Sequence, residues 1–107
     1  MYELTLTNDQ GFKYSPQATV EILSIFRMKA ALDTPDGSPR VMAELPLRVL
    51  EDLRADLEVG HGPRQYCTAH IGAGYWVEVP YAPYPRADFH RALSQDITHM
   101  HRTSDYR

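Results

Sequence analysis

The sequence predicts an α+β fold, in which a small antiparallel sheet of β-hairpins packs on two helices at about residues 46–58 and 86–102. Several short stretches alternate apolar and polar residues between turn-forming residues, which is the pattern of half-buried strands. Two longer stretches repeat apolar residues every three or four positions, which is the pattern of amphipathic helices. We therefore expect one face of the sheet to be covered by helices.

The composition limits the kinds of protein that this chain can be. It has 107 residues, of which 43% are hydrophobic and 23% charged, and this predicts a single globular domain over residues 1–107. The net charge is −3 and no basic block occurs, which disfavours direct binding of nucleic acid. A single cysteine excludes an internal disulfide and suits a reducing, cytoplasmic environment. We find neither a signal-peptide pattern nor an apolar stretch of membrane-spanning length.

A first hairpin is predicted at the start of the chain. Residues 2–7 alternate apolar and polar side chains, and turn-forming residues separate them from the short apolar segment 12–14. A three-residue loop over 9–11 places Leu6 opposite Tyr14. This loop also puts Gly11 at the position that needs a positive φ.

A second hairpin is predicted on either side of the turn-rich loop 34–39. Apolar and polar residues alternate before and after this loop. Pairing Asp33 with Arg40 places the apolar residues of the two strands opposite one another. The same register sets Lys29 opposite Glu44, an opposite-charge pair that stabilises a sheet by a few tenths of a kcal/mol, roughly. This register therefore groups apolar side chains on one face and pairs opposite charges on the other.

The segment 16–25 admits two interpretations. Ser15 followed by Pro16 is a good helix start, because serine caps the first turn and proline suits the first helical position. The segment is also rich in β-branched residues, which favour a strand. Both alternatives stay open at the level of sequence.

The predicted helix 46–58 begins with a proline and ends before Gly60. Leu50, Leu53 and Leu57 form its apolar stripe. Its opposite side carries four acidic residues, Glu51, Asp52, Asp56 and Glu58. These carboxylates could imitate a row of phosphates, although a solvated helix face explains them as well.

The segment 64–85 holds the only tryptophan and the only cysteine of the chain. A three-residue loop over 72–74 pairs Cys67 with Val79, and it gives the hairpin one apolar face, for which we expect burial. Ala69 is then paired with Val77 and Ile71 with Tyr75. The outer face carries Tyr66, Thr68, His70, Trp76 and Glu78.

After this hairpin, three prolines predict an extended segment over residues 80–85. It contributes Tyr81 and Tyr84, which would continue the aromatic character of the outer hairpin face. The last predicted helix, 86–102, carries Phe89, Leu93, Ile97 and Met100 on one side. The competing interpretation is that this helix folds back over the outer face and buries Trp76.

No catalytic or metal-binding motif emerges from residue spacing, so we assign no catalytic residue, metal or cofactor. Cys67 and His70 lie three apart on a predicted strand and point to opposite faces. His90 and His101 share a helix face but stand about 16 Å apart. Cys67 is expected in the core, where a thiol behaves as a small hydrophobe.

The sequence favours a non-catalytic protein-binding module that acts stoichiometrically. Tryptophan and tyrosine concentrate binding energy at protein interfaces, which makes the outer aromatic face the expected contact. We assign partner binding to Tyr66, His70, Trp76, Glu78, Tyr81 and Tyr84, and a secondary acidic contact to Glu51, Asp52, Asp56 and Glu58.

A small acidic inhibitor or adaptor of bacterial, phage or mobile-element type, acting on a host protein or nucleoprotein complex, fits this pattern. A homodimer is compatible with it. The alternative is a small enzyme that uses His61 or His70 with a tyrosine as general acid and base.

Overall fold

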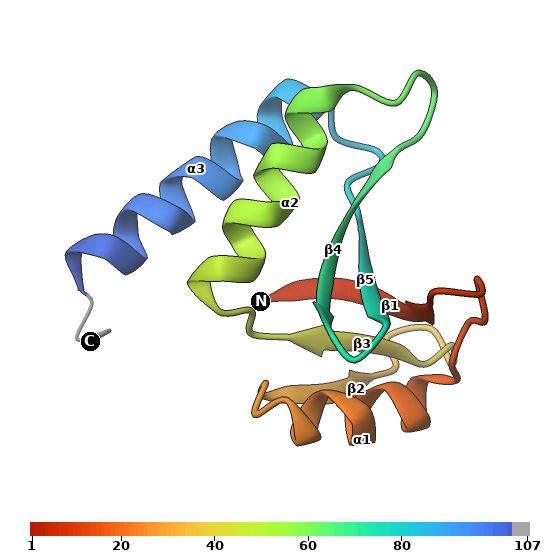
Figure 1. The fold of residues 1–107 in the computed structure, drawn as a ribbon. Helices are drawn as coiled ribbons and strands as arrows, with labels where there is room; N and C mark the ends of the chain where they lie inside the picture. The colour runs from red at the N-terminus through yellow and green to blue at the C-terminus, as the bar shows by residue number, and fades with distance from the viewer. Residues whose placement is uncertain (104–107) are drawn as a thin grey trace.

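The computed structural model describes residues 1–103. Its elements in chain order are β1 (Tyr2–Asn8), α1 (Pro16–Ile25), β2 (Ala30–Asp33), β3 (Arg40–Ala43), α2 (Leu47–Val59), β4 (Tyr66–Gly72), β5 (Tyr75–Pro80) and α3 (Arg86–Arg102). The five strands form one sheet in the order β2-β3-β1-β5-β4, and every neighbouring pair is antiparallel (Figure 1). The predicted α+β fold is confirmed, and α1 is a helix additional to the two expected.

Strand β1 lies in the centre of the sheet, between the β2–β3 hairpin and the β4–β5 hairpin. Helix α2 separates these two hairpins in the sequence. Its first half pairs with β3, with Leu4 opposite Val41. Its second half pairs with β5, with Leu6 opposite Val77. The hairpin predicted after β1 is reduced to one bridge, between Thr7 and Lys13, so residues 12–14 turn back in the expected register without forming a strand.

The second predicted hairpin, β2–β3, is confirmed in register. Asp33 lies opposite Arg40 and Ala30 opposite Ala43. The expected charge pair beside it also forms, with Lys29 Nζ at 3.8 Å from Glu44 Oε2.

Residues 16–25 are helical, which decides between the two interpretations of this segment. The Ser15 side chain accepts a hydrogen bond from the Ala18 N–H, and Pro16 occupies the first turn. Leu23 is fully buried against the sheet. The local start signal and the apolar surface over β2 and β3 therefore outweigh the β-branched content of the segment.

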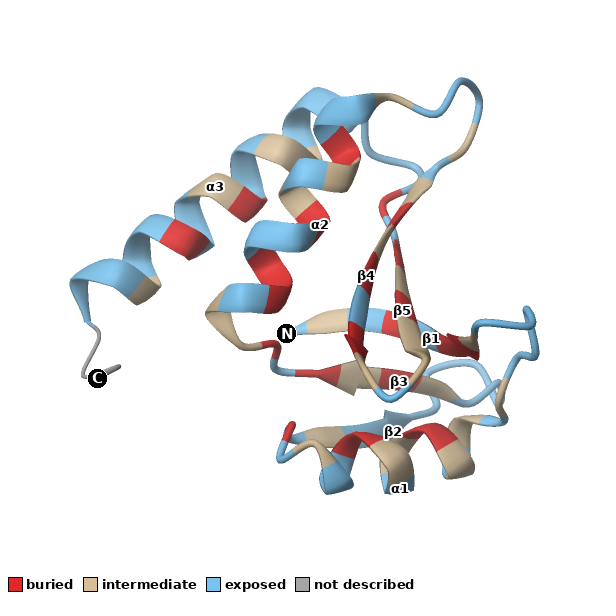
Figure 2. Cartoon of the chain, in the orientation of Figure 1, coloured by how far each residue is buried: buried red, intermediate tan, exposed pale blue. Residues whose placement is uncertain are grey.

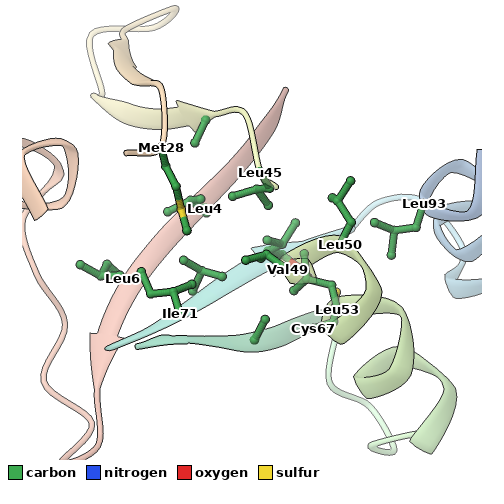
Figure 3. Close-up of a cluster of buried hydrophobic side chains, with 14 of the residues drawn as sticks. Leu4, Leu6, Met28, Leu45, Val49, Leu50, Leu53, Cys67, Ile71 and Leu93 are labelled. Carbon is green, nitrogen blue, oxygen red and sulfur yellow. Dashed lines mark hydrogen bonds between the residues drawn. The ribbon is translucent and has the colours of Figure 1, made fainter. Parts of the chain in front are cut away.

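Helix α2 begins one residue later than predicted, because Pro46 is its N-cap and accepts hydrogen bonds from the backbone N–H groups of Val49 and Leu50. It ends at Gly60, whose φ is +81°. Its buried stripe faces strand β4 on one side and α3 on the other (Figures 1 and 3). The last helix, α3, spans the predicted residues 86–102.

The β4–β5 hairpin has the predicted register except at its turn. Cys67 pairs with Val79 and Ala69 with Val77, as expected. Beyond a bulge at Ile71, however, Gly72 rather than Ile71 pairs with Tyr75. The predicted three-residue loop is therefore wrong, and the turn consists of Ala73 and Gly74, with φ values of +53° and +79°. Positive φ at both positions is typical of the tight hairpin turn whose twist matches the strands.

One face of the sheet forms the core and the other is open. The inward-pointing side chains of the sheet pack against α1 and α2. Figure 2 shows the resulting band of buried residues. The largest fully buried side chains are Leu4, Leu6, Leu23, Leu50, Leu53, Leu93, Val49, Val77, Val79, Thr19 and Cys67. Helix α3 packs along α2 and does not cover the outer sheet face (Figure 1).

Candidate functional site

The outer sheet face carries an aromatic cluster that we call the outer patch, defined as Tyr66, His70, Trp76 and Glu78. His70 and Trp76 are cross-strand partners, and their ring centroids lie 5.0 Å apart. Because His70 is exposed and Trp76 half-buried, both rings can be reached from solvent. The patch therefore combines aromatic surface with polar groups on a rigid sheet.

Trp76 is held in one orientation by the turn that follows β1. Its indole Nε1 donates a hydrogen bond of 2.7 Å to Asp9 Oδ1. The Asp9 backbone N–H in turn donates to the Gly74 carbonyl, which ties this turn to the β4–β5 turn. A Cβ at Gly74 would lie 3.0 Å from Asp9 Oδ2, so glycine also leaves room for the aspartate. The tryptophan is thus pre-organised for contact.

The other end of the outer patch is braced by Arg64. Its guanidinium lies over the Tyr66 ring at 4.7 Å from the centroid, within the range of a cation–π interaction. Thr5 Oγ1 stands 3.5 Å from Glu78 Oε1 on the same sheet face. Both ends of the patch are therefore fixed by neighbouring side chains.

Two residues assigned to the partner surface lie elsewhere. Tyr81 is only 7% exposed, since its hydroxyl donates to the Arg64 carbonyl and its ring stacks on Phe89 at 5.4 Å. The chain turns after Pro80 and carries Tyr81 beneath α3, so its expected exposure is corrected. Tyr84 is 66% exposed but borders a hollow beside α3, away from the outer patch.

Asp56 does not belong to a free acidic row. Its carboxylate accepts hydrogen bonds from Arg64 Nη2 at 2.6 Å and from the Thr68 backbone N–H at 2.8 Å. His61 Nε2 lies 2.9 Å from the other carboxylate oxygen. The Asp56 side chain is 20% exposed and points from α2 to the edge of the sheet. The expectation that it contacts a partner is therefore corrected.

Two of the remaining acidic residues also have partners within the chain. Glu58 Oε2 lies 2.7 Å from His90 Nε2, and Glu51 Oε2 lies 3.6 Å from His101 Nε2. Both histidines belong to α3, so these pairs connect the two helices. Asp52 is exposed on the same helix. The four carboxylates are thus divided among different neighbours and form no continuous anionic surface.

The Asp56 cluster occupies the first part of the free edge of β4. In an edge strand, every second residue directs its backbone N–H and C=O away from the sheet. At this edge, the Thr68 N–H is taken by Asp56 and the Tyr66 carbonyl accepts from Arg64 Nε at 3.0 Å. Addition of a foreign strand would have to displace both bonds. This part of the edge is therefore less accessible to a partner than the outer face.

The histidines of the enzyme alternative have structural neighbours. His61 pairs with Asp56 in the edge cluster, and His70 packs beside Trp76. Neither histidine lines any of the five main hollows of residues 1–103. A general acid or base must meet its substrate within hydrogen-bond reach, so the distance of both histidines from these hollows does not favour them as that pair.

Cys67 is fully buried, as the hairpin register predicted. Burial, and secondly the Asp56 carboxylate, raises the pKa of its thiol to about 12. We expect native protein at pH 8 to react with Ellman's reagent about a thousandfold more slowly than unfolded protein, because so little thiolate is present. Raising the pH to 9 should speed the reaction of the native protein about tenfold but that of the unfolded chain only about threefold, because only the native thiol is still far below its pKa. Rapid release of the coloured product without denaturant would contradict this burial.

Residues 1–103 were compared with the patterns of a metal centre and of a membrane-spanning helix, and they match neither. Among residues 1–103, no three histidine, cysteine or acidic side chains converge as metal ligands. Within the same part of the chain, the helices are too short or too polar to cross a lipid bilayer.

No protein-family model, curated protein or solved structure matches the chain.

Proposed function

We propose that this protein is a non-catalytic binding module that engages a partner protein through the outer patch. The supporting observation is the uncovered sheet face on which Trp76 is fixed by Asp9 and stands beside His70. Aromatic side chains that combine a large apolar area with a polar group are enriched at interface hot spots. A ring already held in place loses little conformational entropy on binding.

The surroundings of the patch suit a protein interface. Thr5, Thr68 and Glu78 provide a polar margin around the aromatic rings. A polar rim around an aromatic centre is the usual arrangement of a protein–protein contact. Because the adjacent β4 edge is capped, we propose recognition by side chains of the sheet face and not by strand addition. Stoichiometric inhibition or adaptor function is the corresponding mode of action.

Replacement of Trp76 by alanine tests this proposal. Protein captured from lysate of the source cells is identified with immobilised wild type, purified, and titrated calorimetrically against each variant. We expect Trp76→Ala to weaken binding about thirtyfold or more, the effect of losing an interface hot spot. Circular dichroism verifies that the variant is folded.

Tyr84→Ala is the matched control, since it removes another exposed aromatic ring outside the outer patch. It should leave the affinity for the captured partner unchanged. If Trp76→Ala and His70→Ala both bind that partner as tightly as wild type, the outer patch is not the interface.

A further inference from the structure

A second surface lies where α3 passes the start of β1 and the end of β5. It is a hollow of about 640 Å³, which is within the range of small-molecule sites. Its aromatic lining consists of Tyr2, Tyr81, Tyr84 and Phe89. The outer patch shares no residue with this hollow, so the two surfaces can be examined independently.

The aromatic rings of the hollow form a connected wall. Phe89 stacks on Tyr81 at 5.4 Å and meets Tyr2 edge-on at 6.4 Å. Tyr84 borders the same space and is 66% exposed, so its ring is free to contact a ligand. The faces of aromatic rings carry partial negative charge and attract cations.

The charged residues that line the hollow, like the aromatic rings, favour a cation. Glu3, Asp88 and Asp96 border the hollow, against the Arg91 guanidinium and Met1, which carries the α-ammonium group. Arg91 is paired with Asp88 at 3.3 Å, and Glu3 is paired with Arg40 outside the hollow. Asp96 instead accepts a hydrogen bond from the Tyr2 hydroxyl. The lining residues thus carry one more negative than positive group, which favours a cation over an anion.

The Tyr2–Asp96 hydrogen bond orients the Asp96 side chain, with Tyr2 as the donor. Burial, and then hydrogen bonding to Asp96, raises the pKa of Tyr2 well above its ordinary value. Tyr2 therefore stays a neutral donor at physiological pH, and its hydroxyl orients the exposed Asp96 side chain beside the aromatic wall. A neutral apolar ligand would desolvate this carboxylate without compensating it.

We propose that this hollow binds a small methylated ammonium compound, with its charge beside Asp96 and its methyl groups against Tyr84, Phe89 and Tyr2. A quaternary ammonium ion presents apolar surface and positive charge together, which matches aromatic walls joined to a carboxylate. A bare metal ion fits less well, because no three ligating side chains of residues 1–103 converge there. This site is additional to the proposed protein interface.

The test uses choline and its neutral carbon isostere, 3,3-dimethylbutan-1-ol, which has nearly the same shape. Binding is followed by amide and aromatic NMR shifts, with the Trp76 indole resonance as the distant reference. We expect choline to shift resonances of Tyr84 and Phe89 and to bind about tenfold more tightly than the isostere, the contribution of cation–π attraction. Equal affinities, or no shift at about 10 mM choline, would overturn the proposal.

Four variants locate the binding. Tyr84→Ala and Asp96→Asn should each weaken choline binding by about tenfold, because they remove an aromatic face and the negative charge. Tyr84→Phe should retain it, and Trp76→Ala should leave it unchanged. Since Tyr84 is largely exposed, Tyr84→Ala is decisive even if Asp96→Asn proves unstable. Unchanged binding in Tyr84→Ala would place choline elsewhere and refute this site.

Discussion

Leu53→Ala should lower the free energy of unfolding by about 3 kcal/mol, the typical effect of opening a cavity in a packed core. Leu53 is 0% exposed and lies on the stripe of α2 that faces the sheet (Figure 3). Removing three methyl or methylene groups there weakens the layer that joins helix and sheet. A domain of this size has a total stability of about 5–15 kcal/mol, so the loss is a large fraction.

Urea denaturation measures this effect, with fluorescence of Trp76, the only tryptophan, as the signal. Val59→Ala on the same helix is the control, because Val59 is 74% exposed. It should change the unfolding free energy by less than about 0.5 kcal/mol. A loss below about 1 kcal/mol for Leu53→Ala would mean that the α2 interface collapses around the gap or is loosely packed.

Asp56→Ala should destabilise the fold by about 2–3 kcal/mol, because it leaves the Thr68 N–H and the Arg64 guanidinium without their acceptor. Partial solvent access at this site limits the loss, since water can replace some of the bonds. Asp56→Asn should lose less, because its amide oxygen can still accept from Thr68. Urea denaturation and hydrogen exchange at the Thr68 amide report both effects.

Asp52→Ala is the control for this experiment, since Asp52 is an exposed carboxylate of the same helix. It changes the net charge equally but removes no acceptor from β4. If Asp56→Ala and Asp52→Ala have the same stability and the same Thr68 exchange rate, the edge cluster does not stabilise the sheet.

Hairpin registers could be predicted from sequence where side-chain alternation was unambiguous. Alternate burial is determined by local pattern, and so Cys67 opposite Val79 and Asp33 opposite Arg40 were found correctly. The turn after β4 was missed because the rule assigns positive φ to glycine. Here Ala73 takes that conformation, and a bulge at Ile71 adjusts the register.

The neighbours of β1 could not be predicted, because no local signal specifies pairing between distant strands. Helix α1 was undecided for a related reason. Its β-branched residues favour a strand, and the Ser15–Pro16 start signal prevails only with the contact of Leu23 with the core. Tertiary packing prevailed over intrinsic preference in this segment.

The candidate sites were predicted in part. Alternation correctly placed His70 and Trp76 on the outer face, opposite the core. Tyr81 was misplaced because proline-rich composition indicates an extended chain without showing which side chains turn inward. The role of Asp56 depends on contacts with Arg64 and Thr68, which come from a different loop and strand. Neither helix periodicity nor charge pattern contains that information.

The central position of β1 also determines when the sheet can form during synthesis. Thr5 pairs with Glu78, 73 residues later in the chain, while Leu4 pairs with Val41 of β3. A ribosome-bound chain can close the β2–β3–β1 half first, but β1 keeps one unpaired edge until β5 emerges. Long-range pairing of this kind slows folding, and an open apolar strand invites association with other chains. The nascent protein therefore carries its greatest aggregation hazard in the interval between the synthesis of β3 and β5.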